Sequence, residues 1–472
     1  VLLQNGDLKL QAVRFLSNNV SAYADGKNTT SLDGSSYASG GAVAGSYGSM
    51  TFNSVDFLGN YASACADVSA YAYGGGVAMK TGSMLLSSTI FASNYVSAYS
   101  FYDKYARVSA FGGAMSIQSG TVDVLKTTFE NNKALASASG YNPLTCAKGG
   151  GIYQISGNMV CDNGIFTSNI ASAKYAQGGA IYHSNGSIQM NDVTFSGNSA
   201  YGYGSISGGF CSGGAINKNG GNMKIASASF IGNVASAFGD GPGDGYSYGG
   251  TINIENAEEM FISSAKFSRN LAAATGDGSC YGGAVNAKNV ERIVISSAGF
   301  YENIALASGY KDAASAYGGA VNAAGCKDVE IDTVVFRNNS VYGSNVLGYG
   351  ARGYGAYGGA VYVDGGVIKF TNTVFLENKA NSGKAYGYGG AIYLADGCMG
   401  TYTVTNGMVV ENIGNNASCG GFLYLGLESK LTFCAQDSAK IIIGSSSLAT
   451  DSIAGTGTLL KTGNGTMTIH SD

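Results

Sequence analysis

The sequence predicts an all-β fold, a right-handed parallel β-helix (β-solenoid) of about twelve coils with variable loops on one side. Three observations predict it. The chain is rich in glycine and poor in charge, a Phe-x-x-Asn motif recurs along it, and a Gly-Gly-x-aliphatic motif alternates with the first at a nearly constant spacing. Such repeats are typical of solenoids, in which each coil buries its apolar residues against the next.

The composition argues against several classes of protein. The 472 residues include 74 Gly and only 2 Pro, and 12% of them are charged, against about 25% in ordinary soluble domains. A chain so rich in glycine must offset its conformational entropy by regular hydrogen bonding. With a net charge of −4 and no run of Lys or Arg, no nucleic-acid partner is expected. No apolar run reaches the ~18 residues of a membrane-spanning helix, so no transmembrane segment is expected.

The Phe-x-x-Asn motif should place like residues above one another in successive coils. We expect its phenylalanines to form a stack in the core and its asparagines to form a ladder of hydrogen-bonded amides. The phenylalanines are Phe15, Phe57, Phe91, Phe129, Phe166, Phe195, Phe230, Phe267, Phe300, Phe336 and Phe375. The asparagines are Asn18, Asn60, Asn94, Asn132, Asn169, Asn198, Asn233, Asn270, Asn303, Asn339 and Asn378.

The spacing of the two motifs divides each coil into a constant and a variable part. From Gly-Gly to the next Phe the distance is 17 positions, as from Gly40 to Phe57, or 18, as from Gly282 to Phe300. From Phe to the next Gly-Gly it varies between 12 and 25 positions. The constant part reads as short strands, and the variable part is expected to carry a loop. Parallel crossovers make the right-handed coil the default.

Two further columns follow from this register. An aromatic residue precedes Gly-Gly in many coils, and an Asn follows it in four successive coils. For these columns we favour a structural role over ligand binding, because stacking follows from the repeat itself. The aromatic column is Tyr73, Phe111, Tyr248, Tyr281, Tyr317, Tyr357 and Tyr388, and the second amide ladder is Asn217, Asn253, Asn286 and Asn322.

The register also predicts the domain organisation. Residues 1–425 form the parallel β-helix repeats, and residues 426–472 form C-terminal β coils. Val1 falls at the aliphatic position of a Gly-Gly-x-aliphatic motif, so the chain begins in the middle of a coil. We therefore expect it to derive from a longer precursor, and its first coil to be covered by further polypeptide, a partner or another copy of itself.

The alternation of Gly-Gly-Ala-Ile with Phe-x-x-Asn resembles the repeats of polymorphic outer-membrane proteins, which are autotransporter-type bacterial surface adhesins. The resemblance covers roughly residues 1–425. The stretch 455–469 is similar to a glycine-punctuated repeat found late in autotransporter passengers. The resemblance implies a parallel β-helix that is exported and displayed outside the cell. Residues 1–472 include no outer-membrane barrel sequence, and the Ser-Ala-Tyr-Gly segments differ from the usual loops.

Residues for catalysis are sparse. The two histidines, His183 and His470, lie in distant coils and are interpreted as surface residues, so no His-based triad or multi-His metal site is expected. The densest acidic group is Glu255, Glu258 and Glu259 beside Lys266 and Arg269, which we interpret as a solvated patch. The sequence therefore predicts no enzyme, no catalytic or metal site and no cofactor.

Cysteines and glycosylation sequons fit an exported protein. There are nine cysteines, and the expected disulfides are Cys146 with Cys161, and Cys419 with Cys434 or Cys398. If the source is eukaryotic, Asn28 is the best candidate for N-glycosylation because it lies in the longest variable segment. The other candidates are Asn19, Asn185, Asn338, Asn416 and Asn464.

Three functions are carried forward. The leading hypothesis is an extracellular, non-enzymatic structural β-solenoid, a self-assembling subunit of a surface filament or layer, and the expected partner is a second copy of the same chain. The alternative is a monomeric surface adhesin that contacts glycans or host proteins through tyrosines such as Tyr99, Tyr102 and Tyr203. A polysaccharide lyase or hydrolase is the least favoured.

Overall fold

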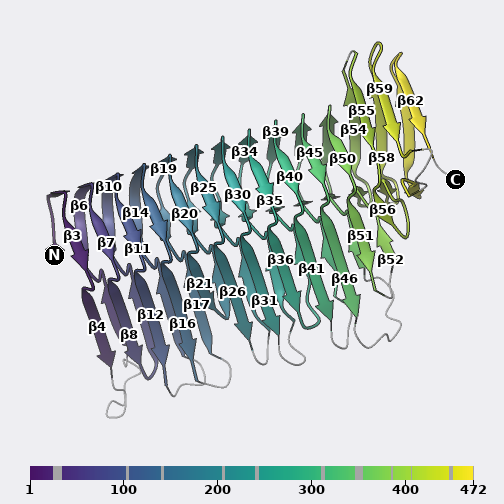
Figure 1. Ribbon diagram of the computed structural model, residues 1–472. Helices are drawn as coiled ribbons and strands as arrows, with labels where there is room; N and C mark the ends of the chain where they lie inside the picture. The colour runs from purple at the N-terminus through teal and green to yellow at the C-terminus, as the bar shows by residue number, and fades with distance from the viewer. Residues whose placement is uncertain are drawn as a thin grey trace. The chain divides into compact units, whose positions relative to one another are not determined.

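The computed structural model describes residues 1–24, 35–101, 106–139, 143–204, 208–239, 244–309, 314–345, 355–383, 386–405, 407–445 and 450–470. They form two compact units. Unit 1 comprises residues 1–219 and 232–245, and unit 2 comprises residues 220–231 and 246–472. Each unit is a right-handed parallel β-helix, so the predicted fold class is confirmed. In unit 1, strands such as β3, β7 and β11 lie side by side in successive coils (Figure 1).

Each coil starts in a broad sheet, here called the wide sheet, which follows Gly-Gly. In unit 1 its strands are β1 (Leu2–Leu3), β2 (Asp7–Gln11), β6 (Val43–Asn53), β10 (Val77–Ser87), β14 (Met115–Leu125), β18 (Ile152–Ser156), β19 (Met159–Asp162), β23 (Ile181–Asn185), β24 (Ile188–Asn191) and β28 (Ile216–Asn219). In unit 2 they are β29 (Met223–Ala226), β33 (Ile252–Glu255), β34 (Glu259–Ser263), β38 (Val285–Lys288), β39 (Arg292–Ser296), β43 (Val321–Ala324), β44 (Asp328–Asp332), β48 (Val361–Asp364), β49 (Val367–Thr371), β53 (Ile392–Leu394), β54 (Met399–Val404), β57 (Leu423–Leu425), β58 (Lys430–Ala435), β60 (Ile453–Gly455) and β61 (Thr458–Thr462).

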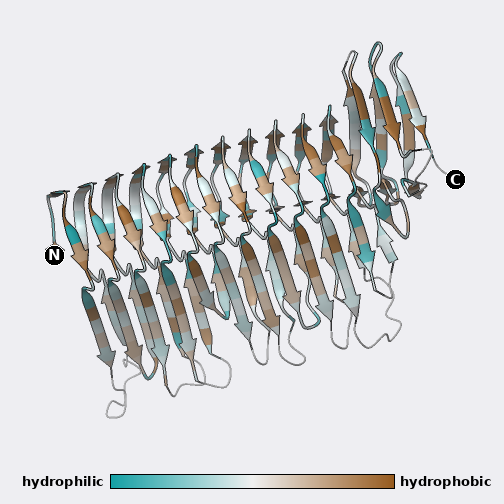
Figure 2. Ribbon diagram, in the orientation of Figure 1, coloured by the Kyte–Doolittle hydropathy of each residue, from teal (hydrophilic) through white to brown (hydrophobic). Residues whose placement is uncertain are grey.

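A short strand around each motif phenylalanine follows, and these strands form the phenylalanine sheet. In unit 1 they are β3 (Arg14–Leu16), β7 (Asp56–Leu58), β11 (Ile90–Ala92), β15 (Thr128–Glu130), β20 (Ile165–Thr167) and β25 (Thr194–Ser196). In unit 2 they are β30 (Ser229–Ile231), β35 (Lys266–Ser268), β40 (Gly299–Tyr301), β45 (Val335–Arg337) and β50 (Val374–Leu376). Figure 2 shows hydrophobic residues recurring at corresponding places in these strands.

The variable part of each coil holds two more strands, one leaving the phenylalanine sheet (the outgoing sheet) and one returning to Gly-Gly (the return sheet). Outgoing strands in unit 1 are β4 (Asn19–Ala24), β8 (Tyr61–Ala66), β12 (Tyr95–Ser100), β16 (Lys133–Ala138), β21 (Ile170–Ala173), β26 (Ser199–Gly204) and β31 (Val234–Gly239), and in unit 2 β36 (Leu271–Thr275), β41 (Ile304–Gly309), β46 (Ser340–Asn345), β51 (Lys379–Ser382) and β56 (Asn416–Ala417). Return strands in unit 1 are β5 (Ser35–Ser39), β9 (Ser69–Tyr73), β13 (Arg107–Phe111), β17 (Leu144–Lys148), β22 (Tyr175–Gln177) and β27 (Phe210–Ser212), and in unit 2 β32 (Tyr246–Tyr248), β37 (Cys280–Tyr281), β42 (Ala316–Tyr317), β47 (Gly355–Tyr357) and β52 (Tyr386–Tyr388).

These two sheets correct the expectation of a loop. Alternate residues of β8, namely Ala62, Ala64 and Ala66, are buried, whereas the residues between them are partly exposed. Alanines of the return sheet, such as Ala70 and Ala72, are buried in the same cluster. Small inward side chains let two strand layers pack against each other, so the variable part is an alanine-filled sandwich. In unit 2 an equivalent cluster includes Ala305 and Ala307.

The phenylalanines stack as predicted in each unit. Neighbouring ring centroids lie 4.6 to 5.0 Å apart with nearly parallel planes. The file runs from Phe15 to Phe195 in unit 1 and from Phe230 to Phe375 in unit 2. Every ring except that of Phe15 is fully buried, and each buried ring stabilises the fold by about 1.5–3 kcal/mol.

The asparagine ladder is confirmed as well, and Asn94 shows its geometry. Its Nδ2 donates to Oδ1 of Asn132 at 2.9 Å and to the carbonyl oxygen of Phe57 at 2.8 Å. Its backbone N–H donates to the same Oδ1 at 3.0 Å, so each amide oxygen accepts two bonds. Buried polar groups cost free energy unless they are paired, and this pattern pairs each amide fully. The rungs are Asn18, Asn60, Asn94, Asn132, Asn169, Asn198 and Asn233 in unit 1, and Asn270, Asn303, Asn339, Asn378 and Asn415 in unit 2.

Gly-Gly makes the corner between the return sheet and the wide sheet. Gly178 has φ of 66°, in the left-handed region that glycine adopts without strain. A Cβ on Gly179 would collide with the backbone of Gly214 in the next coil and of Ser199. Both glycines are therefore required, the first by its dihedral angle and the second by close contact between chains.

The last strands continue the same parallel register. β57 pairs with β60, and β58 pairs with β61. A separate three-stranded sheet contains β55 (Val409–Asn412), β59 (Lys440–Ile443) and β62 (Thr466–Ile469). After residue 426 the described strands belong to the wide sheet and this small sheet. The predicted boundary at residues 425 and 426 stays a prediction.

Candidate functional site

The outer side of the Gly-Gly corner carries the predicted aromatic column. In unit 2 the Tyr281 ring stacks on Tyr248 and on Tyr317, with centroids 4.9 Å apart in both pairs. Tyr357 and Tyr388 extend the stack. In unit 1, Tyr73 and Phe111 lie 5.0 Å apart. The column is therefore packed ring on ring.

The second amide ladder is buried in unit 2. Nδ2 of Asn286 donates to Oδ1 of Asn253, and Nδ2 of Asn322 donates to Oδ1 of Asn286, both at 2.6 Å. Asn217 belongs to unit 1, where its Oδ1 accepts a bond from Oγ of Ser212 at 2.8 Å. The prediction is confirmed for the three asparagines of unit 2.

In unit 1 the same corner holds a hollow of about 470 Å³, which lies within the usual range for small-ligand sites. The return sheet contributes one wall and the wide sheet the other. The first wall consists of Tyr37, Ser39 and Tyr73, and the second includes Ala78, Lys80, Ser116 and Gln118. These residues come from adjacent coils, so the parallel register brings them together. Sequence reasoning missed this site.

The hollow is open because small side chains stand where later coils have rings. Ser116 pairs in register with Tyr153, and Tyr153 with Tyr182. The Tyr153 ring packs on Phe111 with centroids 4.5 Å apart and fills the corner there. In the two preceding coils, Ala78 and Ser116 carry no ring at this position, and both residues line the base of the hollow.

The charges around the hollow are simple. Lys80 is the charged side chain among the described lining residues, and it makes no ion pair in the described part of the chain. Burial, together with the neighbouring Tyr37 and Tyr71, raises the pKa of Tyr73 to about 12. The Tyr73 hydroxyl is therefore protonated at physiological pH and is available as a hydrogen-bond donor.

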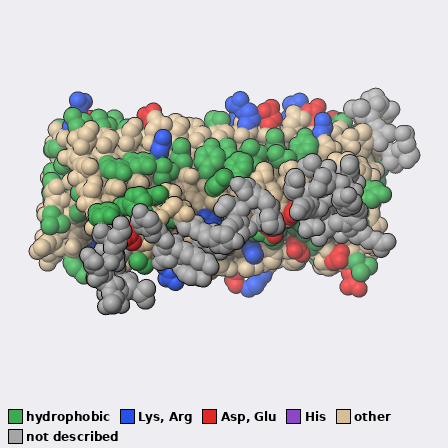
Figure 3. All heavy atoms as spheres, turned by 90° about the horizontal axis from the view of Figure 1, so that it is seen from below, with side chains coloured by type: hydrophobic (Ala, Val, Ile, Leu, Met, Phe, Trp, Pro, Cys, Tyr) green, Lys and Arg blue, Asp and Glu red, His purple; other side chains and the backbone are tan. Residues whose placement is uncertain are grey.

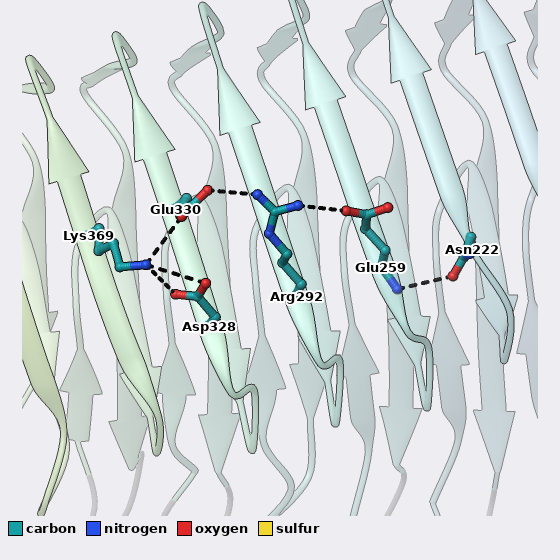
Figure 4. Close-up of polar contacts among 6 residues, drawn as sticks. All are labelled: Asn222, Glu259, Arg292, Asp328, Glu330 and Lys369. Atoms are coloured by element: carbon teal, nitrogen blue, oxygen red, sulfur yellow. Dashed lines mark hydrogen bonds and ion pairs between the residues drawn. The ribbon is translucent and has the colours of Figure 1, made fainter.

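A separate row of ion pairs crosses the outer face of the wide sheet in unit 2 (Figure 4). Arg292 joins Glu259 at 3.0 Å and Glu330 at 3.1 Å, and Lys369 joins Glu330 at 3.2 Å and Asp328 at 3.1 Å. Burial alone would raise the pKa of Glu330, but hydrogen bonds from Lys369 and Arg292 hold it below its ordinary value. Opposite charges thus alternate from coil to coil, which favours this register.

Two carboxylates of the expected acidic patch have partners on the wide sheet. Glu259 pairs with Arg292, its neighbour in the next coil, and Oε1 of Glu255 accepts a bond from Asn253 at 3.2 Å. Lys266 lies over the Tyr301 ring, 5.6 Å from its centroid. Among the residues that the structure describes, no three His, Cys, Asp or Glu side chains gather closely enough to hold a metal ion.

The interpretation of His183 as a surface residue is wrong. In β23 it points inward and is fully buried, between Gln154 and Lys218 of the adjacent coils. Its Nε2 lies 2.9 Å from the carbonyl oxygen of Gly157, and Nζ of Lys218 donates to the carbonyl oxygen of Ser184 at 3.0 Å. Burial, with the Lys218 charge, lowers the pKa of His183 to about 3, and burial lowers that of Lys218 to about 8.

The expected disulfides are not formed, because none of the nine cysteines is joined to another. Cys146 lies in β17 of the return sheet, whereas Cys161 lies in β19 of the wide sheet. The Cys398 thiol contacts the Gly365 N–H at 3.1 Å and the Val363 carbonyl at 3.5 Å, and it does not pair with Cys419 or Cys434. Burial raises the pKa of Cys161 to about 12.

The predicted surface sites are placed as follows. Asn19, Asn185, Asn338, Asn416 and Asn464 are exposed, which glycosylation requires, and their modification stays a prediction. Asn28 and Tyr102 lie outside the described residues. Tyr99 and Tyr203 belong to outgoing strands β12 and β26 and not to loops. On the face shown in Figure 3, charged side chains lie mostly near the margins.

The fold and the hollow together define a parallel β-helix repeat protein with a ligand-sized corner site. The chain is 38% identical over 120 residues to Probable autotransporter YfaL of Escherichia coli (strain K12). The match covers 21% of this chain and 9% of that protein, so the chain spans a small part of its relative's length. No family model and no solved structure matches. The described residues contain no helix long and apolar enough to cross a membrane.

Proposed function

We propose that this chain is an exported, non-enzymatic β-solenoid, displayed at a cell surface like the passenger of an autotransporter, where it serves as a stiff structural element. The observation that carries the proposal is the unbroken coil-to-coil register within each unit. Phenylalanines, ladder asparagines and corner tyrosines each stack on their counterparts. The partial identity to an autotransporter supports the exported location.

The chemistry of the described side chains supports a non-enzymatic role. His183 is buried and tied to the Gly157 carbonyl, which keeps it away from any substrate. Glu259 and Glu330 are paired with Arg292, and such exposed pairs are ordinary surface features. Incubation of the purified protein with a panel of polysaccharides should release no product, and any reproducible release would revive the lyase or hydrolase alternative.

Self-association into a filament or layer is the finer part of the proposal. Parallel strands of neighbouring coils pair by backbone hydrogen bonds, as β3 does with β7 and β4 with β8, and a sheet edge accepts a strand from a second copy in the same way. Leu16 and Tyr23, which lie on β3 and β4, are well exposed.

Two measurements test this function. Antibodies against the purified chain should label intact, unpermeabilised cells that make the protein, with a cytosolic marker as the negative control. Labelling seen only after permeabilisation would overturn the surface location. Electron microscopy over a wide concentration range should show regular fibres or arrays, and dispersed particles at all concentrations would refute self-assembly while leaving display intact.

A monomeric adhesin is the second candidate, and the hollow in unit 1 favours it. A purely structural solenoid has no need of an open corner between two tyrosines. Contacts with host glycans or proteins would then be added to the structural role.

A further inference from the structure

We propose that the hollow in unit 1 binds a sugar residue that carries a carboxylate, as uronic acids and sialic acids do. The inference rests on the proposed extracellular location, where such glycans are met. Neither the fold nor the partial relative assigns a ligand to this hollow.

The aromatic wall suits the ring of a sugar. Tyr37 is 64% exposed, and Tyr71 covers one face of its ring at a centroid distance of 5.1 Å. The rings of Tyr37 and Tyr73 both line the hollow. A sugar has a face of C–H groups, which packs on an aromatic ring while its hydroxyls stay free for hydrogen bonds.

The opposite wall supplies hydrogen bonds and charge. Gln118, with Ser39 across the hollow, offers amide and hydroxyl groups to sugar hydroxyls, whereas Ser116 lies buried at the base of the hollow. Lys80 is exposed, and the described lining includes no acidic side chain to neutralise it. A bound carboxylate would form a charge-assisted hydrogen bond with the ammonium group. Charge complementarity therefore favours an acidic sugar over a neutral one.

Lys148, in the same unit, is a lysine whose ammonium group already has a partner within the chain. Its Nζ donates to the hydroxyl of Tyr182 at 3.0 Å and lies 4.2 Å from the centroid of that ring. The equivalent corner there is filled by Tyr153 and Tyr182, whose centroids lie 5.4 Å apart. Lys80 faces an open hollow instead, and this difference between coils marks the site.

The chain itself offers a variant that closes the site. Ser116→Tyr places in the hollow the residue that the next two coils carry at that position, so its ring should stack on Tyr153 and the variant should fold. Lys80→Gln removes the charge while keeping most of the side-chain length.

Tyr386 is 63% exposed and lies two residues before Tyr388, as Tyr37 lies two residues before Ser39. Tyr386→Ala in unit 2 is therefore a matched control for Tyr37→Ala, and Lys9→Gln in β2 is a matched control for Lys80→Gln.

The experiment is calorimetric titration of the purified full chain with a sialic acid-bearing trisaccharide, a uronate tetramer and a neutral tetramer. One acidic glycan should bind at least tenfold more tightly than the neutral one. Whichever of the two acidic glycans binds identifies the acidic sugar as a sialic acid or a uronic acid. Ser116→Tyr, Lys80→Gln and Tyr37→Ala should each weaken this binding at least tenfold, and the two controls should change it less than twofold. Thermal melting should show that all variants fold.

Three results would overturn the inference. They are no binding of either acidic glycan, equal binding of the neutral one, and acidic-glycan binding that Ser116→Tyr leaves intact. None of these results bears on surface display, which antibody labelling tests separately.

Discussion

The side-chain amide of Asn415 donates to Oδ1 of Asp451 at 2.9 Å, and this bond ends the asparagine ladder of unit 2. The same carboxylate accepts the backbone N–H of Asn415 at 2.8 Å and that of Gly414 at 2.7 Å. Asp451 is fully buried. A carboxylate accepts without needing a further partner, so no amide is left unpaired at the end of the row.

Asp451→Ala should destabilise the C-terminal coils, because it leaves two buried donors of Asn415 and one partly buried donor of Gly414 without this acceptor, at about 1–3 kcal/mol for each buried unsatisfied group. Asp451→Asn should cost less, since one amide oxygen remains, but its N–H₂ group would face a backbone donor. Urea unfolding measures both effects. Asp437→Ala is the control, because it removes an exposed carboxylate that accepts a hydrogen bond from Asn464. The free energy of unfolding of this variant should stay within about 0.5 kcal/mol of the wild-type value. Equal losses at residues 437 and 451 would contradict this role of Asp451.

Phe267→Ala should cost about 3–5 kcal/mol, because it opens a cavity in the stack. The Phe267 ring lies between Phe230 and Phe300, with centroids 4.6 Å away on each side. Phe261 on the neighbouring strand points outward and is partly exposed, so Phe261→Ala is the matched control and should cost far less. Thermal melting compares the two variants, and similar losses would refute the register.

Ala305→Leu should destabilise unit 2 by about 1–3 kcal/mol, because the alanine sandwich leaves no room for a larger side chain. Ala305 is fully buried, whereas the next residue, Leu306, is 37% exposed on the outer face of the same strand. Leu306→Ala should therefore have little effect on the melting temperature. A tolerated leucine at position 305 would mean that the variable part is not tightly packed.

Lys218→Met should stabilise unit 1 near pH 7. The folded-state pKa of Lys218 lies near 8 instead of 10.5, so the folded chain binds fewer protons than the unfolded chain between these values. Lys218 should then contribute a rise in the free energy of unfolding with pH from 8 to 10.5, by up to about 3 kcal/mol. Buried thiols and phenols such as Cys161 and Tyr73, whose pKa values are raised, act in the opposite direction in every variant, so the contribution of Lys218 is the difference in slope between the wild type and Lys218→Met. Lys133→Met on the surface should leave the wild-type slope unchanged. Urea unfolding at several pH values tests this, and an unchanged slope in Lys218→Met would contradict it.

Thiol labelling checks the cysteines. Cys161, Cys211, Cys280, Cys326 and Cys398 are buried and form no disulfide, so a thiol reagent should leave them unmodified in the native protein and modify them in urea. Mass spectrometry of the labelled protein would identify any disulfide, and a Cys146–Cys161 or Cys398–Cys419 bridge would contradict the structure.

The parts of the fold that repeat at fixed spacing could be predicted from the sequence. Phe91 and Asn94 recur at one place in each coil, and stacking follows from periodicity alone. The alanine sandwich was missed although its signal is present, since Ala62, Ala64 and Ala66 alternate with a period of two. Variable length is typical of a loop, and the length of this segment therefore favours a loop over a strand.

Other features depended on neighbours from other coils. His183 lies two residues after Ile181 in a strand, and this alternation could have placed it inside. No comparable pattern in the sequence indicates the hollow. It arises from the sizes of Ser116, Tyr153 and Tyr182 across three coils, together with the Gly-Gly corner that sets Tyr73 opposite them. The same register buries Ala235 and Ala237 in β31, so shortening the segment 235–246 would remove core residues.

The asparagine ladder also gives each unit an electrical direction. In each described rung, Nδ2 donates one N–H to the amide oxygen of the following coil while Oδ1 accepts from the preceding coil, so the small dipoles add along the row, as peptide dipoles do in a helix. In unit 2 the positive end meets the Asp451 carboxylate, which is the charge that electrostatics favours there. A coil with Asp at this position has no N–H₂ group to offer, so it acts as a terminator that stops the row from growing.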